Sequence, residues 1–328
     1  MNIYITLDYE LFLNDITGDV EHCLIIPTQE LLKVLNKHQV RATFFVDMAY
    51  IYRINELRSQ YLSLQEDYEK VIEQVKTLAL NNHKIGLHLH PQWFYSKYNG
   101  KEWTVDFEHY KLSDMPEEEA CDKFEDCHKM LEKIIGRKVD AFRAGGFSIQ
   151  TFNPFGKLMI KCGILKDSTV IYKGRLLSNL HYYDYSNLKS PELYKFNEDI
   201  ARPIENGNIT EFPISTTMIG LFSYCLNRYK YHKAQGNSNW GNGGDLPSNR
   251  RTGFIRSIFR KLKPFVGVGA TIDYQSFFNL EYVYKKYKKG RKNSFVILGH
   301  PKNLSPLSIQ TLDLFITKTI EQDNYKTI

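Results

Sequence analysis

The sequence has no long hydrophobic run and few cysteines. None of its 328 residues fall in a stretch of about 18 consecutive apolar side chains, which excludes an ordinary transmembrane helix. Residues 1–6 lack the basic start and the apolar run of a signal peptide. The five cysteines are odd in number and scattered, which favours reduced thiols over a disulfide framework. We therefore expect a cytoplasmic protein.

The chain also lacks internal repeats, and it has no low-complexity linker before about residue 228. Its hydrophobic content of 42% allows a large core and argues against disorder. We expect a single domain over residues 1–328, with a basic insertion at about 228–263.

Predicted strands and helices alternate along the chain. An alternating strand at 2–10 is followed by a helical pattern at 27–36 and a largely apolar strand at 40–46. A second helical pattern at 67–82 leads into a strand at 84–90. Further strands are expected at 139–143, 163–168, 209–213 and 294–298, and further helices from about 116 to 136 and at 305–322. This order is typical of an α/β fold with parallel strands.

Two histidines lie on one face of the predicted strand at 84–90. Side chains alternate along a strand, so His88 and His90 point together, about 7 Å apart at Cα. Pro91 cannot donate to a sheet and marks the end of the strand. Such a pair is typical of a metal site, although one structural and one surface histidine would give the same pattern.

Charged residues also close other apolar runs. Asp8 and Glu10 share one face of the first strand, while Tyr9 faces the other way. Later runs end at Arg143, Asp167, Glu211 and His300. In barrels of parallel strands this end carries the catalytic residues. The alternatives are a plain salt bridge for Arg143, a strand-end cap for Asp167 and a structural role for Glu211.

These motifs resemble those of the polysaccharide deacetylases, the NodB-like carbohydrate esterases of family 4. The similar segments follow the family's order, at residues 6–10, 42–46, 88–91, 141–145, 167–169 and 298–301. The resemblance implies an α/β fold, an irregular (β/α) barrel of about seven parallel strands.

Two positions depart from the family pattern. The family usually has adjacent acids, a general base and then a metal ligand, but here Tyr9 stands second and Glu10 follows it. Because Glu10 shares a face with Asp8, we expect Glu10 to be the ligand. The family also commonly spaces its histidines four apart, whereas His88 and His90 are two apart.

The resemblance implies a metal-dependent hydrolase. Glu10, His88 and His90 form a two-histidine, one-carboxylate set, and Zn²⁺ is the expected divalent metal. By the family's pattern Asp8 is the base and His300 the acid. Arg143 orients Asp8 and keeps it ionised, and Asp167 fixes or charges His300.

The implied reaction is removal of acetyl groups from an N- or O-acetylated sugar in glycan or polysaccharide biosynthesis. The substrate would be an acetylated sugar or a lipid-linked or nucleotide-linked glycan. There are two alternatives. One is a non-catalytic glycan-binding relative that has lost metal binding because of Tyr9, and the other is a hydrolase of a non-sugar amide.

A basic segment interrupts the alternation at 228–263, with nine Lys or Arg against the single acid Asp245. A second cluster at 285–292 adds six more bases. The segment's apolar helical stripe is Phe254, Ile255, Ile258, Phe259 and Leu262, with Arg256, Arg260, Lys261 and Lys263 around it.

One interpretation of the basic segment is a solvated face on an ordinary packing helix. The other is contact with a diphosphate-linked sugar or with an anionic membrane surface, which would place the protein peripherally at the inner face of the membrane. Nucleic acid is not an expected partner, because no reading helix or stacking sheet accompanies the charge.

Overall fold

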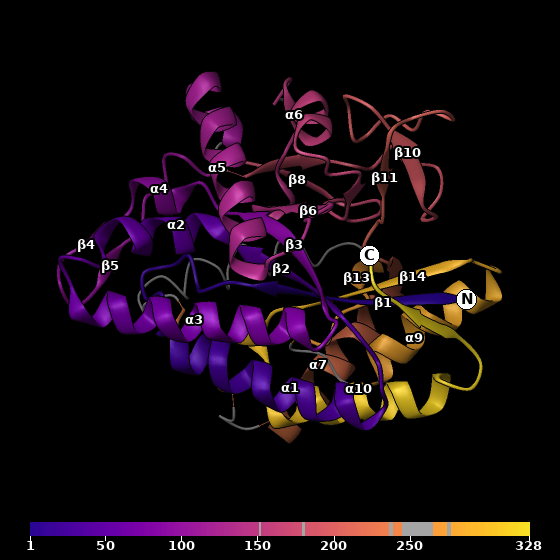
Figure 1. The fold of residues 1–328 in the computed structure, drawn as a ribbon. Helices are drawn as coiled ribbons and strands as arrows, with labels where there is room; N and C mark the ends of the chain where they lie inside the picture. The colour runs from indigo at the N-terminus through magenta and orange to yellow at the C-terminus, as the bar shows by residue number, and fades with distance from the viewer. Residues whose placement is uncertain (151, 179–180, 236–238, 245–264, 274–276) are drawn as a thin grey trace.

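The computed structural model describes residues 1–150, 152–178, 181–235, 239–244, 265–273 and 277–328. One nine-stranded sheet organises the fold (Figure 1). Its strands in spatial order are β10 (Tyr194–Phe196), β11 (Ile209–Glu211), β7 (Lys166–Asp167), β6 (Ala141–Ala144), β3 (Lys84–Leu89), β2 (Thr43–Asp47), β1 (Asn2–Tyr9) and β14 (Ser294–Gly299). The ninth strand, β15 (Asn324–Lys326), pairs with the first half of β1.

All pairs in this sheet are parallel except β10 with β11, so the predicted α/β barrel of parallel strands is confirmed. The sequence did not predict β10 or β15. Both are three-residue strands, too short for a clear alternation of apolar and polar side chains.

The sheet is curled, and the chain after β11 connects β7 on one side of it with β14 at the other edge. The N–H of Phe212 donates to the Asp167 carbonyl at 2.8 Å, and the N–H of Ser215 donates to the Val296 carbonyl of β14 at 3.1 Å. Inward-facing side chains fill the space that this closure encloses. They are Tyr4, Phe45, Ala141, Phe212, Ile214, Val296 and Ile328.

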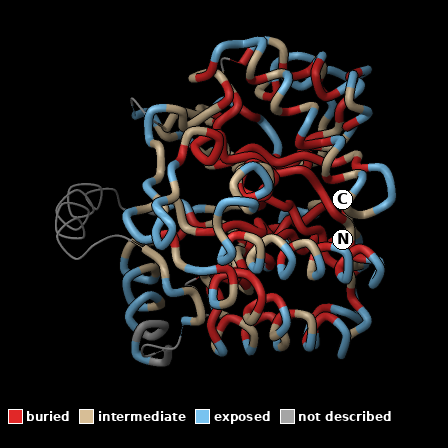
Figure 2. The backbone as a smooth tube through the Cα atoms, turned by 60° about the vertical axis from the view of Figure 1, so that its left-hand side comes forward, coloured by how far each residue is buried: buried red, intermediate tan, exposed pale blue. Residues whose placement is uncertain are grey.

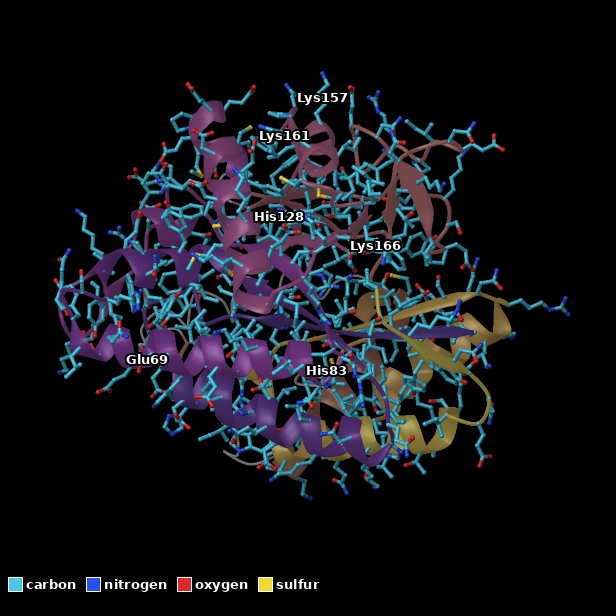
Figure 3. All side chains as sticks on the ribbon, in the orientation of Figure 1. Glu69, His83, His128, Lys157, Lys161 and Lys166 are labelled. Carbon is cyan, nitrogen blue, oxygen red and sulfur yellow. The ribbon has the colours of Figure 1, made fainter. Side chains whose placement is uncertain are left out.

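Helices cover the outer faces of the sheet. In Figure 1, α1 (Ile26–Lys37), α3 (Leu62–Leu80) and α10 (Pro306–Thr319) lie below β1, and α5 (Glu117–Ile135) and α6 (Phe155–Lys161) lie above it. The other described helices are α2 (Met48–Leu57), α4 (Gln92–Tyr95), α7 (Leu221–Gln235) and α9 (Phe277–Lys289). Buried strands run between exposed outer helix faces (Figure 2), and charged α6 residues such as Lys157 point outward (Figure 3).

The predicted helix signals at α5 are present. Pro116 precedes the helix, three glutamates occupy its first turn, and Gly136 ends it in the left-handed conformation with φ 67°. The predicted helix at 67–82 begins earlier, at Leu62, and the sequence did not predict α2 or α9.

Outside the main sheet, three pairs of short strands lie in the segments that connect its strands and helices. They are β4 (Lys97–Tyr98) with β5 (Trp103–Thr104), β8 (Arg175–Leu177) with β9 (Tyr182–Asp184), and β12 (Thr216–Gly220) with β13 (Phe265–Gly269). The expected apolar stripe and bases of 254–263 lie outside the described residues. Among the described helices, none is long and apolar enough to cross a bilayer.

Candidate active site

A buried ion pair joins β1 to β6. Alternation along β1 turns Ile5 and Leu7 toward the helices and Asp8 inward. There Oδ1 of Asp8 accepts a hydrogen bond from Nη1 of Arg143 at 2.6 Å, and both side chains are almost fully buried. The predicted contact between Arg143 and Asp8 is therefore present.

The Arg143 guanidinium is fixed on several sides. Its Nε donates to the carbonyl of Ser168 at 2.7 Å, and its Nη2 donates to Oγ of Ser168 at 2.8 Å and to Oγ1 of Thr6 at 2.9 Å. The carbon of the guanidinium lies 4.3 Å from the centre of the Phe45 ring. A charge held in this way can hold Asp8 in one orientation.

Glu10, His88 and His90 meet at the carboxyl end of the barrel. Oε2 of Glu10 lies 2.8 Å from Nε2 of His88 and 2.6 Å from Nε2 of His90. Tyr9 turns to the opposite face, where its hydroxyl donates to Oε1 of Gln74 at 2.9 Å. The predicted alternation of Tyr9 and Glu10 is thus observed, and all three polar side chains are buried.

A backbone carbonyl orients the His88 ring, whereas His90 is held by its own backbone N–H and by the packing of Gly145. Nδ1 of His88 lies 2.7 Å from the carbonyl oxygen of Arg143, which leaves Nε2 facing Glu10. The N–H of His90 donates to Oδ1 of Asp47 at 3.2 Å. Gly145 packs against the His90 ring, where an added Cβ would collide with the imidazole.

The trio fits a divalent metal. Within the described residues it is the one group of three side chains whose donor atoms all lie within 4.8 Å of one another. Burial lowers the pKa of His88, but Asp8, Glu10 and Asp47 outweigh it and raise the pKa to about 9. The surrounding carboxylates thus favour positive charge at the position that a dication would take. The donor set is that of catalytic zinc sites.

His300 enters the same site from the end of β14. Its Nε2 lies 3.5 Å from Oδ2 of Asp8 and 3.7 Å from Oε1 of Glu10. Its Nδ1 is hydrogen-bonded to Oδ2 of Asp273, whose Oδ1 accepts from the His300 N–H at 3.0 Å. Burial lowers the pKa of His300, but the Asp273, Asp8 and Glu10 carboxylates outweigh it, and the net shift is upward.

The expected pairing of Asp167 with His300 is wrong, because Asp273 takes that position. Asp167 instead accepts the N–H of Thr169 at 2.7 Å and bonds to the side chain of Glu211, its neighbour across β7 and β11. Burial raises the pKa of both carboxyl groups, and for Glu211 the adjacent Asp167 adds to the rise. Both side chains are fully buried and accept backbone N–H groups, Asp167 from Thr169 and Glu211 from Val170, which supports a structural role for this pair.

Sequence reasoning missed three charged residues of the site. Asp273 closes the apolar stretch 265–272, so the rule that identified the other strand ends would have found it. Asp47 ends β2, opposite His88 in the register. Lys302 follows His300 by two residues, and its Nζ lies 2.8 Å from Oε1 of Glu10. It lies in a 3-10 turn, Pro301–Asn303, where no side-chain period applies.

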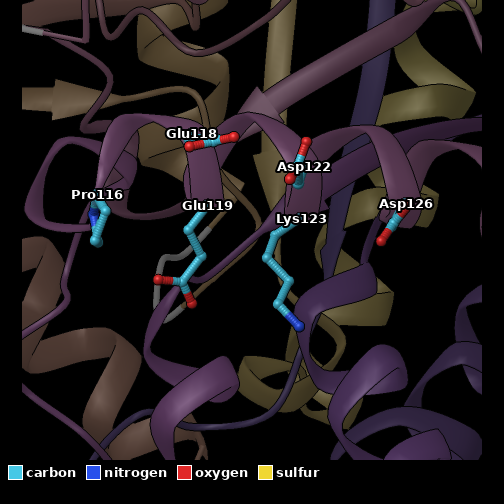
Figure 4. Close-up of a pocket in the computed structure, with 6 residues that line it drawn as sticks. All are labelled: Pro116, Glu118, Glu119, Asp122, Lys123 and Asp126. Carbon is cyan, nitrogen blue, oxygen red and sulfur yellow. The ribbon is translucent and has the colours of Figure 1, made fainter.

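A separate hollow of about 370 Å³ lies along α5, lined by Pro116, Glu118, Glu119, Asp122, Lys123 and Asp126. Figure 4 shows Glu119 and Lys123 pointing to the same side of the helix. None of these residues belongs to the cluster at the barrel end.

Comparison with known sequences supports the resemblance to the polysaccharide deacetylases and covers the motifs at 42–46, 88–91 and 141–145. Residues 26–151 match the sequence model of the family described as polysaccharide deacetylase. The matched segment contains His88, His90 and Arg143, whereas Asp8, Glu10 and His300 lie outside it. No curated protein matches the sequence.

Solved structures resemble the fold. A probable polysaccharide deacetylase from Pseudomonas aeruginosa PAO1 has a TM-score of 0.50 at 12% identity, over 99% of this chain and 86% of that one. Puue allantoinase gives 0.49 at 12% identity, over 99% and 87%. The polysaccharide deacetylase Bc1974 from Bacillus cereus gives 0.40 at 13%, over 99% and 91%. The first of these supports the barrel fold.

Proposed function

We propose that the protein is a metal-dependent hydrolase that removes acetyl groups from an N- or O-acetylated sugar in glycan or polysaccharide biosynthesis. One observation carries this proposal: an arginine-paired carboxylate, a Glu–His–His trio and a carboxylate-paired histidine meet at the carboxyl end of one barrel. The family match supports the reaction class.

Asp8 and His300 are the proposed base and acid. Asp8 accepts a proton from water as the water oxygen attacks the acetyl carbonyl carbon. When the C–N or C–O bond breaks, His300 gives a proton to the departing amine or alkoxide, and acetate is released. The Asp273 carboxylate holds the imidazole so that Nε2 faces the reaction, and Arg143 holds Asp8.

Glu10, His88 and His90 would hold the metal, which we take to be zinc. When bound, it would supply Lewis-acid chemistry that polarises the carbonyl and lowers the pKa of water. The protein's part is to orient the donors, through the contact of His88 Nδ1 with the Arg143 carbonyl and the packing of Gly145 on His90.

The test is acetate release from a panel of lipid-linked and nucleotide-linked acetylated sugars, together with metal analysis of the purified protein. About one zinc per chain and chelator-sensitive release support the proposal. Zinc-free protein that binds glycans without releasing acetate would favour the non-catalytic alternative. Chelator-resistant hydrolysis of non-sugar amides would favour the second alternative, a hydrolase of a non-sugar amide.

We also propose that the enzyme is cytoplasmic and docks on the anionic inner face of a membrane. Phe222, Leu226 and Tyr229 lie on one face of α7, and Phe222 is 81% exposed. The helix carries Arg228 and Lys233 and has no acidic residue. Exposed aromatic side chains beside bases on a helix without acidic residues suit an anionic lipid surface.

A further inference from the structure

Lys302 contacts Glu10 on the side away from the two histidines. Its ammonium lies 2.8 Å from Oε1 of Glu10 and also donates to the carbonyl of Leu11 at 2.8 Å. The side chain is only 11% exposed, and its Nζ lies 5.1 Å from the centre of the Phe12 ring. A buried lysine with two fixed acceptors has little freedom to leave this carboxylate.

The backbone also holds Lys302 in place. The turn at Pro301–Asn303 closes through the N–H of Asn303, which donates to the carbonyl of His300 at 2.9 Å. Gly241 packs so closely on the carbonyl of Lys302 that an added Cβ would collide with it. The position of Lys302 is therefore coupled to that of His300, two residues earlier.

The two oxygens of Glu10 consequently face different partners. Oε2 lies within 2.8 Å of Nε2 of both His88 and His90, whereas Oε1 lies 2.8 Å from Nζ of Lys302 and 3.7 Å from Nε2 of His300. The carboxylate is thus divided between a cationic side chain on one oxygen and the metal-binding position on the other.

We propose that Lys302 is a positioning residue that withholds Oε1 of Glu10 from the bound metal, so that this carboxylate offers one donor atom. The inference rests on the proposed function. A catalytic zinc site needs an open coordination position for water and substrate, and a carboxylate donating through both oxygens would occupy it. Lys302 would therefore keep a coordination position open. It would also lower the affinity for the metal, because its positive charge repels that of the metal.

The test compares Lys302→Met with the wild type, using two separate readouts. The zinc dissociation constant is measured on metal-free protein by competition with a chromophoric chelator, and kcat is measured by acetate release. Without the lysine, Oε1 is free and one positive charge is gone, so we expect zinc to bind at least about 10-fold more tightly while kcat falls by about 10-fold or more. Lys302→Arg should keep both values near those of the wild type.

A matched control is Lys288→Met. Lys288 also pairs with a buried carboxylate, Asp323 at 2.7 Å, but at the opposite end of β1, beside Met1. This variant should leave zinc affinity and kcat unchanged. If Lys302→Met does not fold, as judged by circular dichroism, Lys302→Gln carries the same test.

Wild-type or weaker zinc affinity in the folded neutral variant overturns the role of Lys302 and leaves the proposed function standing. Wild-type protein that binds no zinc and releases no acetate overturns both.

Discussion

Both carboxylate oxygens of Asp273 bond to His300, one to Nδ1 of the ring and the other to the backbone N–H at 3.0 Å. This double contact fixes the imidazole by two separate bonds, and the carboxylate favours its protonated form. Asp273 approaches from a segment beside β14, where Thr271 forms a bridge to Leu298.

Asp273→Asn should therefore narrow the pH range of activity. The Asp273 carboxylate raises the pKa of His300, so the acid stays protonated to higher pH in the wild type. Its loss should move the alkaline limb of the rate profile to lower pH and reduce turnover at neutral pH, by up to the roughly 100-fold to 10,000-fold that losing a general acid costs. Acetate release from pH 5 to 9 measures both effects.

The control is Asp313→Asn, which alters a surface Asp–His pair with His38 and should leave the pH profile unchanged. An identical shift in that control would contradict the assignment of Asp273 as the partner of the acid His300.

Asp8→Asn should keep its fold and its zinc but lose about 100-fold to 10,000-fold in rate. The amide can still accept a hydrogen bond from Arg143, which limits the cost of leaving that charge buried. Circular dichroism measures the fold of the variant, metal analysis its zinc content and acetate release its rate. Wild-type turnover in a folded, zinc-loaded variant would refute the role of base.

His90→Ala should lose its metal, because Nε2 of His90 is one of three converging donors. The measurement is zinc per chain after dialysis against a weak chelator. His22→Ala is the control, since His22 contacts Asp19 at the surface, away from the cluster. Full zinc occupancy in His90→Ala would show that the ligand set is wrong.

Acid should destabilise the fold partly through His83 (Figure 3). Burial of the ring lowers the pKa of His83 to about 4, and the nearby positive charge of Arg41 adds to the fall. The unfolded chain binds this proton near its ordinary pKa of 6.5, so folding stability falls as the pH drops from about 6.5 to about 4. The upper bound of this contribution is about 3 kcal/mol. Urea unfolding at pH 7.5 and 4.5 should show a smaller difference for His83→Asn than for the wild type; an equal difference would exclude His83 as the cause.

Phe222→Ser should weaken binding to anionic vesicles by about 10-fold, because it removes a largely exposed aromatic side chain from α7. Co-sedimentation with anionic and neutral vesicles at low and high salt is the measurement. Leu80→Ser is the control, since Leu80 on α3 is also 81% exposed. Equal binding by the two variants, or no wild-type binding to anionic vesicles at low salt, rules out docking through this face.

Local periodicity accounts for the part of the site that the sequence predicted. Alternation along a single strand places Asp8 with Glu10 and His88 with His90, and the parallel order of the strands brings these faces to one end. The contact of Arg143 with Asp8 was instead implied by the resemblance to the family, and the structure shows it.

The missed residues depend on packing between distant segments. Asp273 reaches His300 through an irregular segment beside β14, and Lys302 reaches Glu10 from a single 3-10 turn. The 3-10 turn leaves no repeating pattern in the sequence, and the apolar stretch 265–272 marks Asp273 as a strand-end residue without indicating that its partner is His300. The assignment of Asp167 to His300 failed for the same reason, because its actual neighbour, Glu211, is set by the pairing of β7 with β11.

The pairing of β1 with β14 has a consequence for how the protein is made. β1 ends at Tyr9 and β14 begins at Ser294, so a ribosome adding about 5 to 20 residues per second needs on the order of 15 to 60 s between them. The Glu10, His88 and His90 donors emerge early in that interval, whereas His300 and Lys302 emerge at its end. We therefore expect the growing chain to acquire its cation donors well before it acquires the acid and the lysine that complete the centre.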